Sequence, residues 1–147
     1  MPGVASLHAR QYYAHPQNLF WKILGTALGF DPAMPYEQRT AQLAAAHIAV
    51  WDVLQSCVRE GSLDADIEAD SIVPNDFTRF FARQPGITRI CFNGATAETL
   101  FRRHVLPGLP SLQAELMRLP STSPANAGMS RDEKLRIWAQ AVASRNA

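Results

Sequence analysis

The sequence is poor in residues that form cross-links and metal sites. Its 147 residues include only two cysteines, Cys57 and Cys91, too few for a disulfide framework or a thiolate-built zinc or iron–sulfur site. Both have apolar neighbours, so we expect them to be buried as small apolar side chains. No apolar run approaches the roughly 20 residues that cross a bilayer, and no signal-peptide pattern opens the chain. We therefore expect a cytoplasmic protein without a membrane partner.

Lysine is also scarce. Lys22 and Lys134 are the only lysines, and arginine supplies the other cations. Arginine can bind phosphate in bidentate fashion, but GC-rich genomes also encode it often, so its excess alone does not indicate a nucleic-acid partner. The formal net charge of +1 neither requires nor excludes such a partner. Composition therefore leaves the function open.

Alternating strand and helix patterns predict an α/β fold, and the length fits a single domain over residues 1–147. Three apolar segments are expected to be buried strands: 47–54, 87–94 and 112–119. Helical patterns cover residues 18–28, 36–46, 75–82 and 95–105. Ser130 and Glu133 form a capping box that should open a last helix through Ala143. These elements predict a three-layer αβα sandwich with a short parallel sheet.

The loops that follow the strands are the expected location of the site. In open α/β sheets, ligands bind beyond the carboxyl ends of the strands. This rule indicates residues 55–66, 93–96 and 120–128. No strand precedes the opening Met-Pro-Gly-Val-Ala-Ser, yet its Pro-Gly is typical of a loop that leaves a strand. We expect that a first strand is missing, through truncation or a misassigned start codon.

The most informative motif is Tyr-Ala-His-Pro-x-Asn-x-Phe-Trp at residues 13–21. It resembles the first conserved region of the mismatch-uracil and hypoxanthine DNA glycosylases, in which a Pro-Gly turn (here Pro2-Gly3) is followed by an aromatic residue, His-Pro and Asn-x-Phe-Trp. Further segments resemble the hypoxanthine branch in the same order: Trp51-Asp52, residues 59–64, Asn93-Gly94 and Leu-Pro-Ser-Thr-Ser-Pro-Ala-Asn at 119–126. The resemblance covers nearly the whole chain.

Membership of the uracil-DNA glycosylase superfamily would make the protein a monofunctional enzyme that acts on double-stranded DNA. It would flip hypoxanthine out of the duplex, with uracil and xanthine as further candidate bases, and hydrolyse the N-glycosidic bond to start base excision repair. No lysine stands in the motifs to form a Schiff base, because Lys22 lies in the expected first helix, so no lyase activity is expected. The resemblance implies a monomer without cofactor or metal.

The resemblance places catalysis on Asn18. Breaking an N-glycosidic bond builds positive charge on the sugar and negative charge on the departing base. An amide can accept a hydrogen bond from the attacking water and donate another to the base. The mismatch-uracil branch positions water with an Asn just before the Pro-Gly turn; that slot is Met1 here, which favours the hypoxanthine branch. Asn18 could instead cap the helix that begins near Leu19, and both roles can hold.

Base recognition would fall on residues before Asn18. Tyr13 matches the position that stacks on the flipped base, a contact worth about 1–3 kcal/mol, and Tyr12 offers a second aromatic face. Both tyrosines could instead be packing residues. His15 could donate to the base or to a phosphate, or could fix the loop by bonding to the backbone.

Two further groups complete the candidate site. The polar loop residues Ser121, Thr122, Ser123 and Asn126 could bind one DNA phosphate without a lysine, although such residues are also common in turns. Asp52 near a strand end would face the purine or bond to a loop amide, because a buried carboxylate needs a partner. The acidic run 64–70 is expected to be solvated rather than metal-binding.

Two other interpretations compete. A non-catalytic nucleic-acid-binding relative would fit the loss of a first strand, which is internal to the superfamily's sheet. Asn18, Tyr13 and the Ser-Thr-Ser-Pro loop argue against that reading. A different small α/β hydrolase is disfavoured, because the sequence has no G-x-S-x-G elbow, P-loop or G-x-G-x-x-G stretch.

Overall fold

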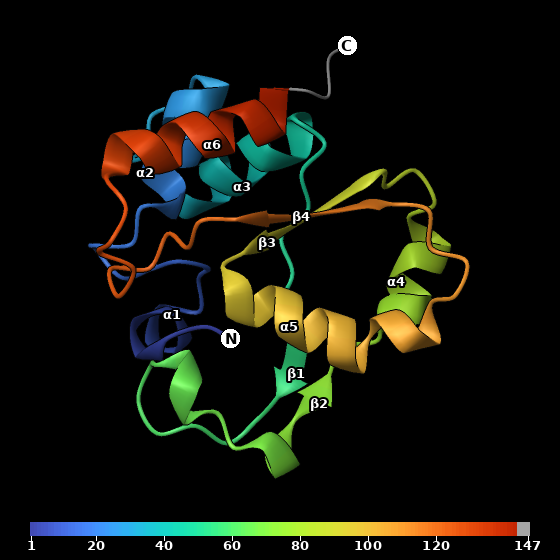
Figure 1. The fold of residues 1–147 in the computed structure, drawn as a ribbon. Helices are drawn as coiled ribbons and strands as arrows, with labels where there is room; N and C mark the ends of the chain where they lie inside the picture. Colours follow the sequence, from blue (N-terminus) through green and yellow to red (C-terminus); the bar gives the residue numbers. More distant parts are fainter. Residues whose placement is uncertain (144–147) are drawn as a thin grey trace. The chain divides into compact units, whose positions relative to one another are not determined.

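The computed structural model describes residues 1–143, in which helices and short strands alternate (Figure 1). These residues gather in two compact units. We call Pro2–Trp51 together with the chain from Pro120 onward the helical unit, and Met1 with Asp52–Leu119 the strand unit. The α/β class predicted from the sequence is confirmed, and the single domain expected from the length stays a prediction.

The helical unit is built on the packing of α2 against α6. Its described helices are α1 (Val4–Ala9), α2 (Phe20–Leu28), α3 (Tyr36–Ala45) and α6 (Arg131–Ala143). The Phe20 ring meets Trp138 of α6 edge-on at 5.9 Å, and Trp21 meets Tyr36 of α3 edge-on at 5.8 Å. Figure 1 shows α2, α3 and α6 together. Buried aromatic and aliphatic side chains thus join the three helices, each contributing about 1.5–3 kcal/mol.

The strand unit holds both sheets. Its described elements, in chain order, are β1 (Leu54–Ser56), η1 (Asp64–Asp66), η2 (Ala69–Ser71), β2 (Val73–Pro74), α4 (Phe77–Arg83), β3 (Arg89–Asn93), α5 (Ala95–His104), η3 (Leu106–Gly108) and β4 (Glu115–Leu119). β1 pairs with β2 antiparallel, and β3 pairs with β4 in parallel. The core of this unit is a cluster of Phe77, Phe92, Phe101 and Val105. Phe77 comes from α4, Phe92 from β3 and Phe101 from α5, so the two helices and the strand share one core.

Gly94 links the end of β3 to the start of α5. Its backbone has φ 96° and ψ 170°, a conformation open essentially only to glycine. Its N–H donates to the Leu119 carbonyl at 3.0 Å, where β4 ends. The glycine therefore lets the chain turn into the helix while it keeps the carboxyl ends of the two parallel strands in register.

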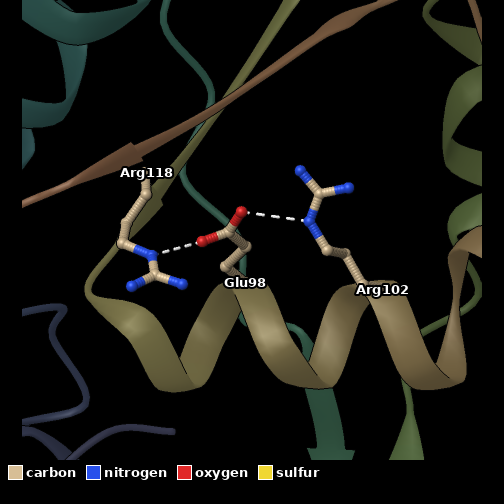
Figure 2. Close-up of polar contacts among 3 residues, drawn as sticks. All are labelled: Glu98, Arg102 and Arg118. Atoms are coloured by element: carbon tan, nitrogen blue, oxygen red, sulfur yellow. Dashed lines mark hydrogen bonds and ion pairs between the residues drawn. The ribbon is translucent and has the colours of Figure 1, made fainter.

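An ion-pair network joins α5 to β4 in the strand unit (Figure 2). The Glu98 carboxylate accepts hydrogen bonds from Arg118 Nε and, at 3.0 Å, from Arg102 Nε one turn further along α5. The hydrogen bond from Arg118, followed by that from Arg102, lowers the pKa of Glu98 below its ordinary value. The network thus favours the ionised carboxylate at neutral pH.

The predicted strand at residues 47–54 is wrong, apart from Leu54 at the start of β1. α3 ends in a left-handed turn with His47 at φ 58°. Ile48 N–H donates to the Leu43 carbonyl and His47 N–H to the Ala44 carbonyl, at 2.9 and 3.0 Å. This is a Schellman arrangement, which satisfies the last carbonyls of the helix and turns the chain out of it. The parallel sheet therefore contains β3 and β4, and β1 lies in the antiparallel pair.

One smaller expectation is also corrected. The expected loop at Pro2-Gly3 precedes helix α1 (Val4–Ala9), a helix that the sequence did not predict. The cysteines were expected to be buried, but Cys57 is half-buried and Cys91 is exposed. Cys91 lies on β3 next to the buried Phe92, and neighbouring residues on a strand face opposite sides. Only one of these two side chains can point into the core cluster.

Candidate active site

The loop before α2 is held at three points by the helices around it. Tyr12 N–H donates to the Tyr36 hydroxyl at 3.1 Å, and Trp21 Nε1–H donates to the Tyr12 carbonyl at 2.9 Å. Ala14 N–H donates to Oγ of Ser6, a buried residue of α1, at 3.0 Å. Helices α1, α2 and α3 thus fix the backbone on both sides of Tyr13, the predicted base-stacking residue.

Tyr13 itself has a strained backbone. Its φ of 55° lies in the left-handed region, which costs a residue other than glycine about 1–3 kcal/mol. Its half-buried ring stacks on Phe20 with centroids 4.0 Å apart and planes tilted by 26°. The Tyr12 ring lies 6.3 Å from it. The surrounding contacts thus hold the Tyr13 ring in place in spite of its unfavourable backbone conformation. Backbone strain of this kind is typical of functional sites.

His15 is exposed at the start of the His-Pro turn. Its Nδ1 accepts the Gln17 N–H at 3.1 Å, and its carbonyl accepts the Asn18 N–H at 2.9 Å. A ring nitrogen that accepts a hydrogen bond carries no proton, so the neutral ring is protonated on Nε2. His15 therefore fixes the loop through the backbone, one of its two expected roles, and keeps Nε2–H as a donor.

Asn18 caps the first turn of α2. Its Oδ1 accepts the Phe20 N–H at 3.0 Å, and the side chain is half-buried. Within residues 1–143 this is the only hydrogen bond of its carboxamide, so the second lone pair of Oδ1 and both hydrogens of Nδ2 have no protein partner. The amide can therefore cap the helix and still accept from a water molecule and donate to a ligand.

Ser121 and Ser123 form two successive turns in the loop between β4 and α6. Ser121 Oγ accepts the Ser123 N–H, and Ser123 Oγ accepts the Ala125 N–H, each at 3.2 Å. The Asn126 Nδ2 then donates to the Ser121 carbonyl at 3.2 Å and closes the loop. Each serine oxygen is used as an acceptor, and no described residue takes its hydroxyl hydrogen. The loop therefore presents hydroxyl donors in fixed positions.

Thr122 connects this loop to the Asn18 motif. Its side chain is 0% exposed, so Thr122 contributes a carbonyl rather than a surface hydroxyl to the site. That carbonyl accepts the N–H of Leu19, the residue directly after Asn18, at 3.0 Å. Two motifs about 100 residues apart, both in the helical unit, are thereby brought to adjacent positions.

Helix α6 holds both ends of the loop. Trp138 Nε1–H donates to the Pro120 carbonyl at 2.8 Å, and Lys134 Nζ donates to the Asn126 carbonyl at 2.6 Å. Lys134 is 2% exposed. Sequence reasoning expected no lysine at the motifs, and this one was missed because a lysine in the first turn of an amphipathic helix normally reads as a surface residue. The signal that could have indicated its burial is the four-residue spacing from Trp138, which places both side chains on the same face of α6.

Asp52 belongs to the strand unit, whereas the residues above belong to the helical unit. Its backbone carbonyl accepts a hydrogen bond from Asn75 Nδ2 at 2.8 Å. Burial raises the pKa of the half-buried carboxyl, and the N-terminal ammonium opposes part of that shift. Such a carboxyl group is suited to exchanging a proton or a hydrogen bond with a ligand.

The segment 59–64 closes on itself beside the acidic run. Arg59, whose side chain is 6% exposed, pairs with Asp64 at 3.5 Å. The acidic residues between 64 and 70 are exposed on η1, η2 and the turn between them, which confirms the expectation of a solvated segment. No three His, Cys, Asp or Glu side chains within residues 1–143 are grouped to hold a metal ion. The helices of the described chain are also too short or too polar to span a membrane.

Comparison with known proteins places this geometry in a family. No protein-family model matches the chain. It is 35% identical over 135 residues to a hypoxanthine DNA glycosylase of Methanosarcina acetivorans, covering 91% of this chain and 81% of the relative. It is 32% identical over 142 residues to a hypoxanthine DNA glycosylase of Methanosarcina barkeri, covering 96% and 85%.

A solved structure has the same fold. It is a solution NMR structure of a Methanosarcina acetivorans protein assigned as a uracil DNA glycosylase, with a TM-score of 0.80 and 33% sequence identity. The match covers 99% of this chain and 86% of that chain. The fold and the sequence together define a DNA glycosylase of the uracil-DNA glycosylase superfamily. Within that superfamily, the chain belongs to the hypoxanthine DNA glycosylases.

Proposed function

We propose that this enzyme hydrolyses the N-glycosidic bond of deoxyinosine in double-stranded DNA, releases hypoxanthine and leaves an abasic site. The observation that carries this proposal is the hydrogen bond from Leu19 N–H to the Thr122 carbonyl. It joins the segment that contains Asn18 to the loop that contains Ser121 and Ser123, which supports a site with both an amide and hydroxyl donors. Uracil and xanthine are the further candidate bases.

Asn18 would hold the attacking water. In the reaction the water oxygen bonds to C1′ of the deoxyribose, the bond from C1′ to the base nitrogen breaks, and the base leaves with the electron pair. The attacking water then loses one proton and the departing base takes one up from water, so that the products are a C1′ hydroxyl and neutral hypoxanthine. The free lone pair of Asn18 Oδ1 suits a water hydrogen, and Nδ2–H suits the base, on which negative charge develops. An amide is a weak base, which is sufficient because the sugar is already close to an oxocarbenium ion when water attacks.

Tyr12, Tyr13 and His15 would receive the flipped base. Tyr13 replaces the stacking that the base loses on leaving the duplex, and its left-handed backbone and its contact with Phe20 fix the ring beforehand. Tyr12 borders that ring, and His15 Nε2–H is a donor for the base or a phosphate. Asp52, a carboxyl of raised pKa, is the candidate for a contact to the purine edge.

Ser121, Ser123 and Asn126 would bind the phosphate next to the flipped nucleotide, with Thr122 as the buried anchor of their loop. The internal bonds of both serines use only oxygen lone pairs, so each hydroxyl hydrogen can point to a phosphate oxygen. A fixed loop loses little conformational entropy when it binds DNA. That the enzyme works as a cytoplasmic monomer without lyase activity stays a prediction from the sequence.

The test is a strand-cleavage assay on labelled duplexes that each carry one hypoxanthine or one uracil. Excision leaves an abasic site, which alkali converts to a strand break, so cleavage only after alkali also reports the absence of lyase activity. We expect hypoxanthine to be released faster than uracil. A folded protein that binds these duplexes but cleaves none of them would overturn the proposal in favour of a non-catalytic DNA-binding relative.

A further inference from the structure

Lys134 is the buried charge that the mechanism above does not use. It is 2% exposed, and its Nζ makes one hydrogen bond, to the Asn126 carbonyl at 2.6 Å. No carboxylate of the described residues 1–143 pairs with it. Burying an ammonium group without a counter-ion costs several kcal/mol, so such groups are normally paired. The ammonium of Lys134 therefore has no counter-ion within the part of the chain that the structure describes.

The position of this charge indicates the anion. Side chains of an α-helix lean toward its N-terminus, and Lys134 in the first turns of α6 reaches back into the 120–126 loop. Trp138, one turn later on the same face, holds the Pro120 carbonyl at the other end of the loop. α6 thus holds both ends of the loop through hydrogen bonds from its side chains. The loop itself contains serine hydroxyls and an amide, and no cation.

We infer that Lys134 is a positioning residue for DNA binding: its buried ammonium fixes the loop through Asn126 and supplies the positive charge that a DNA phosphate on the loop neutralises. The inference rests on the proposed function, because it deepens the phosphate contact assigned there to Ser121 and Ser123. A buried cation acts at close range in a medium of low dielectric constant, so it strengthens hydroxyl-to-phosphate hydrogen bonds that are weak on their own.

The inference separates stability from binding. A residue that only packed would make the protein less stable when replaced. Removing a buried ammonium that has no counter-ion relieves its desolvation cost, and this gain offsets the lost hydrogen bond to the Asn126 carbonyl. Lys134→Met should therefore unfold at the same temperature as the wild type or higher, and should bind DNA less tightly. Lys134→Arg should keep the charge and the DNA affinity.

The experiment measures the dissociation constant for a duplex with one tetrahydrofuran abasic site between 50 and 200 mM salt. Each phosphate neutralised adds about 0.9 to the salt slope, so over this fourfold range Lys134→Met should lose about 3.5-fold less affinity than the wild type. Lys22→Met is the matched control, because it removes the same charge from the other lysine, which is half-buried on α2. Its slope should equal that of the wild type.

The outcomes are distinct. An unchanged slope in folded Lys134→Met, together with a lower unfolding temperature, would refute the inference and make Lys134 a structural residue. Lys134→Gln, which keeps a donor for Asn126 and removes the charge, gives the same readout if the methionine variant does not fold. A wild type that excises hypoxanthine while all slopes agree would overturn this inference alone. A wild type that releases no base from any duplex would overturn the proposed function instead.

Discussion

Replacing Asn18 by alanine separates its two roles, because their energies differ. The change removes the 3.0 Å hydrogen bond from Phe20 N–H to Oδ1, and the loss of such a cap costs about 1 kcal/mol. A domain that is stable by about 5–15 kcal/mol stays almost fully folded after this loss. A donor that acts on charge in the transition state is worth about 100- to 1000-fold in rate. Unfolding therefore cannot account for a rate effect of that size.

The assay is the single-turnover rate of hypoxanthine release, with thermal unfolding measured on the same samples. We expect Asn18→Ala to lose at least about 100-fold in rate, while its unfolding midpoint falls by about 2–4 °C. Asp76→Ala is the matched control, because Asp76 Oδ1 accepts the Arg79 N–H at 3.0 Å and caps α4 in the strand unit. Equal small rate losses in both variants, below about tenfold, would refute catalysis by Asn18 and leave it as a cap.

Substitutions at three other positions test separate parts of the structure. Tyr13→Ala should slow release by roughly 5- to 150-fold through lost stacking, and Tyr13→Phe should not; an unchanged rate would assign the ring to packing. Gly25→Ala places a methyl carbon 2.7 Å from the Phe30 carbonyl oxygen, so urea unfolding should show a loss of about 1–3 kcal/mol instead of the gain usual inside a helix. Glu98 has a lowered pKa, so its ion pairs stabilise the fold above the ordinary pKa of 4.5, and this stabilisation is lost as pH falls through the pKa of the folded state. The unfolding midpoints of the wild type and Glu98→Gln should therefore converge in acid. A difference in midpoint that persists there would count against the ion pairs.

Helices with strong local signals were predictable from the sequence. The pattern at 36–46 became α3 (Tyr36–Ala45), and the pattern at 95–105 became α5 (Ala95–His104). One of the two hydrogen bonds of the expected capping box is present, since Ser130 Oγ accepts the Glu133 N–H at 3.2 Å. This bond joins residues three positions apart and does not depend on the rest of the fold, so the local sequence was enough to predict it.

The segment 47–54 shows where the sequence was insufficient. A short apolar run reads equally well as a strand or as an extended connection, and hydrophobic periodicity does not separate the two. The deciding event is the left-handed conformation of His47, and a histidine gives no signal for it, whereas a glycine would have. The parallel pairing of β3 with β4 was expected because strand patterns alternate with helical patterns along the chain, and the structure confirms it.

The connections within the candidate site could not be predicted from the sequence, and the catalytic and binding roles of its residues stay predictions. The cap on Asn18 follows from local sequence and was one of its two expected roles. The hydrogen bond that joins Leu19 to Thr122 is a tertiary contact between distant segments, which no local pattern specifies. Burial of Lys134 is of the same kind, because the solvent exposure of one helix face depends on which loop covers it.

Two costs in stability lie where the chemistry is proposed. Tyr13 is held in a left-handed backbone conformation, and Lys134 is a buried charge without a counter-ion among residues 1–143; both lie in the helical unit and contact the two motifs. By contrast, Glu98 in the strand unit is fully paired with two arginines. A loop that only packed would be more stable with glycine at position 13 and an apolar residue at 134. Local rules are broken in folded proteins mainly at functional sites. Backbone strain in the loop before α2 and a buried charge beside the loop between β4 and α6 therefore favour an enzyme that binds and distorts DNA over a protein that has kept only the fold.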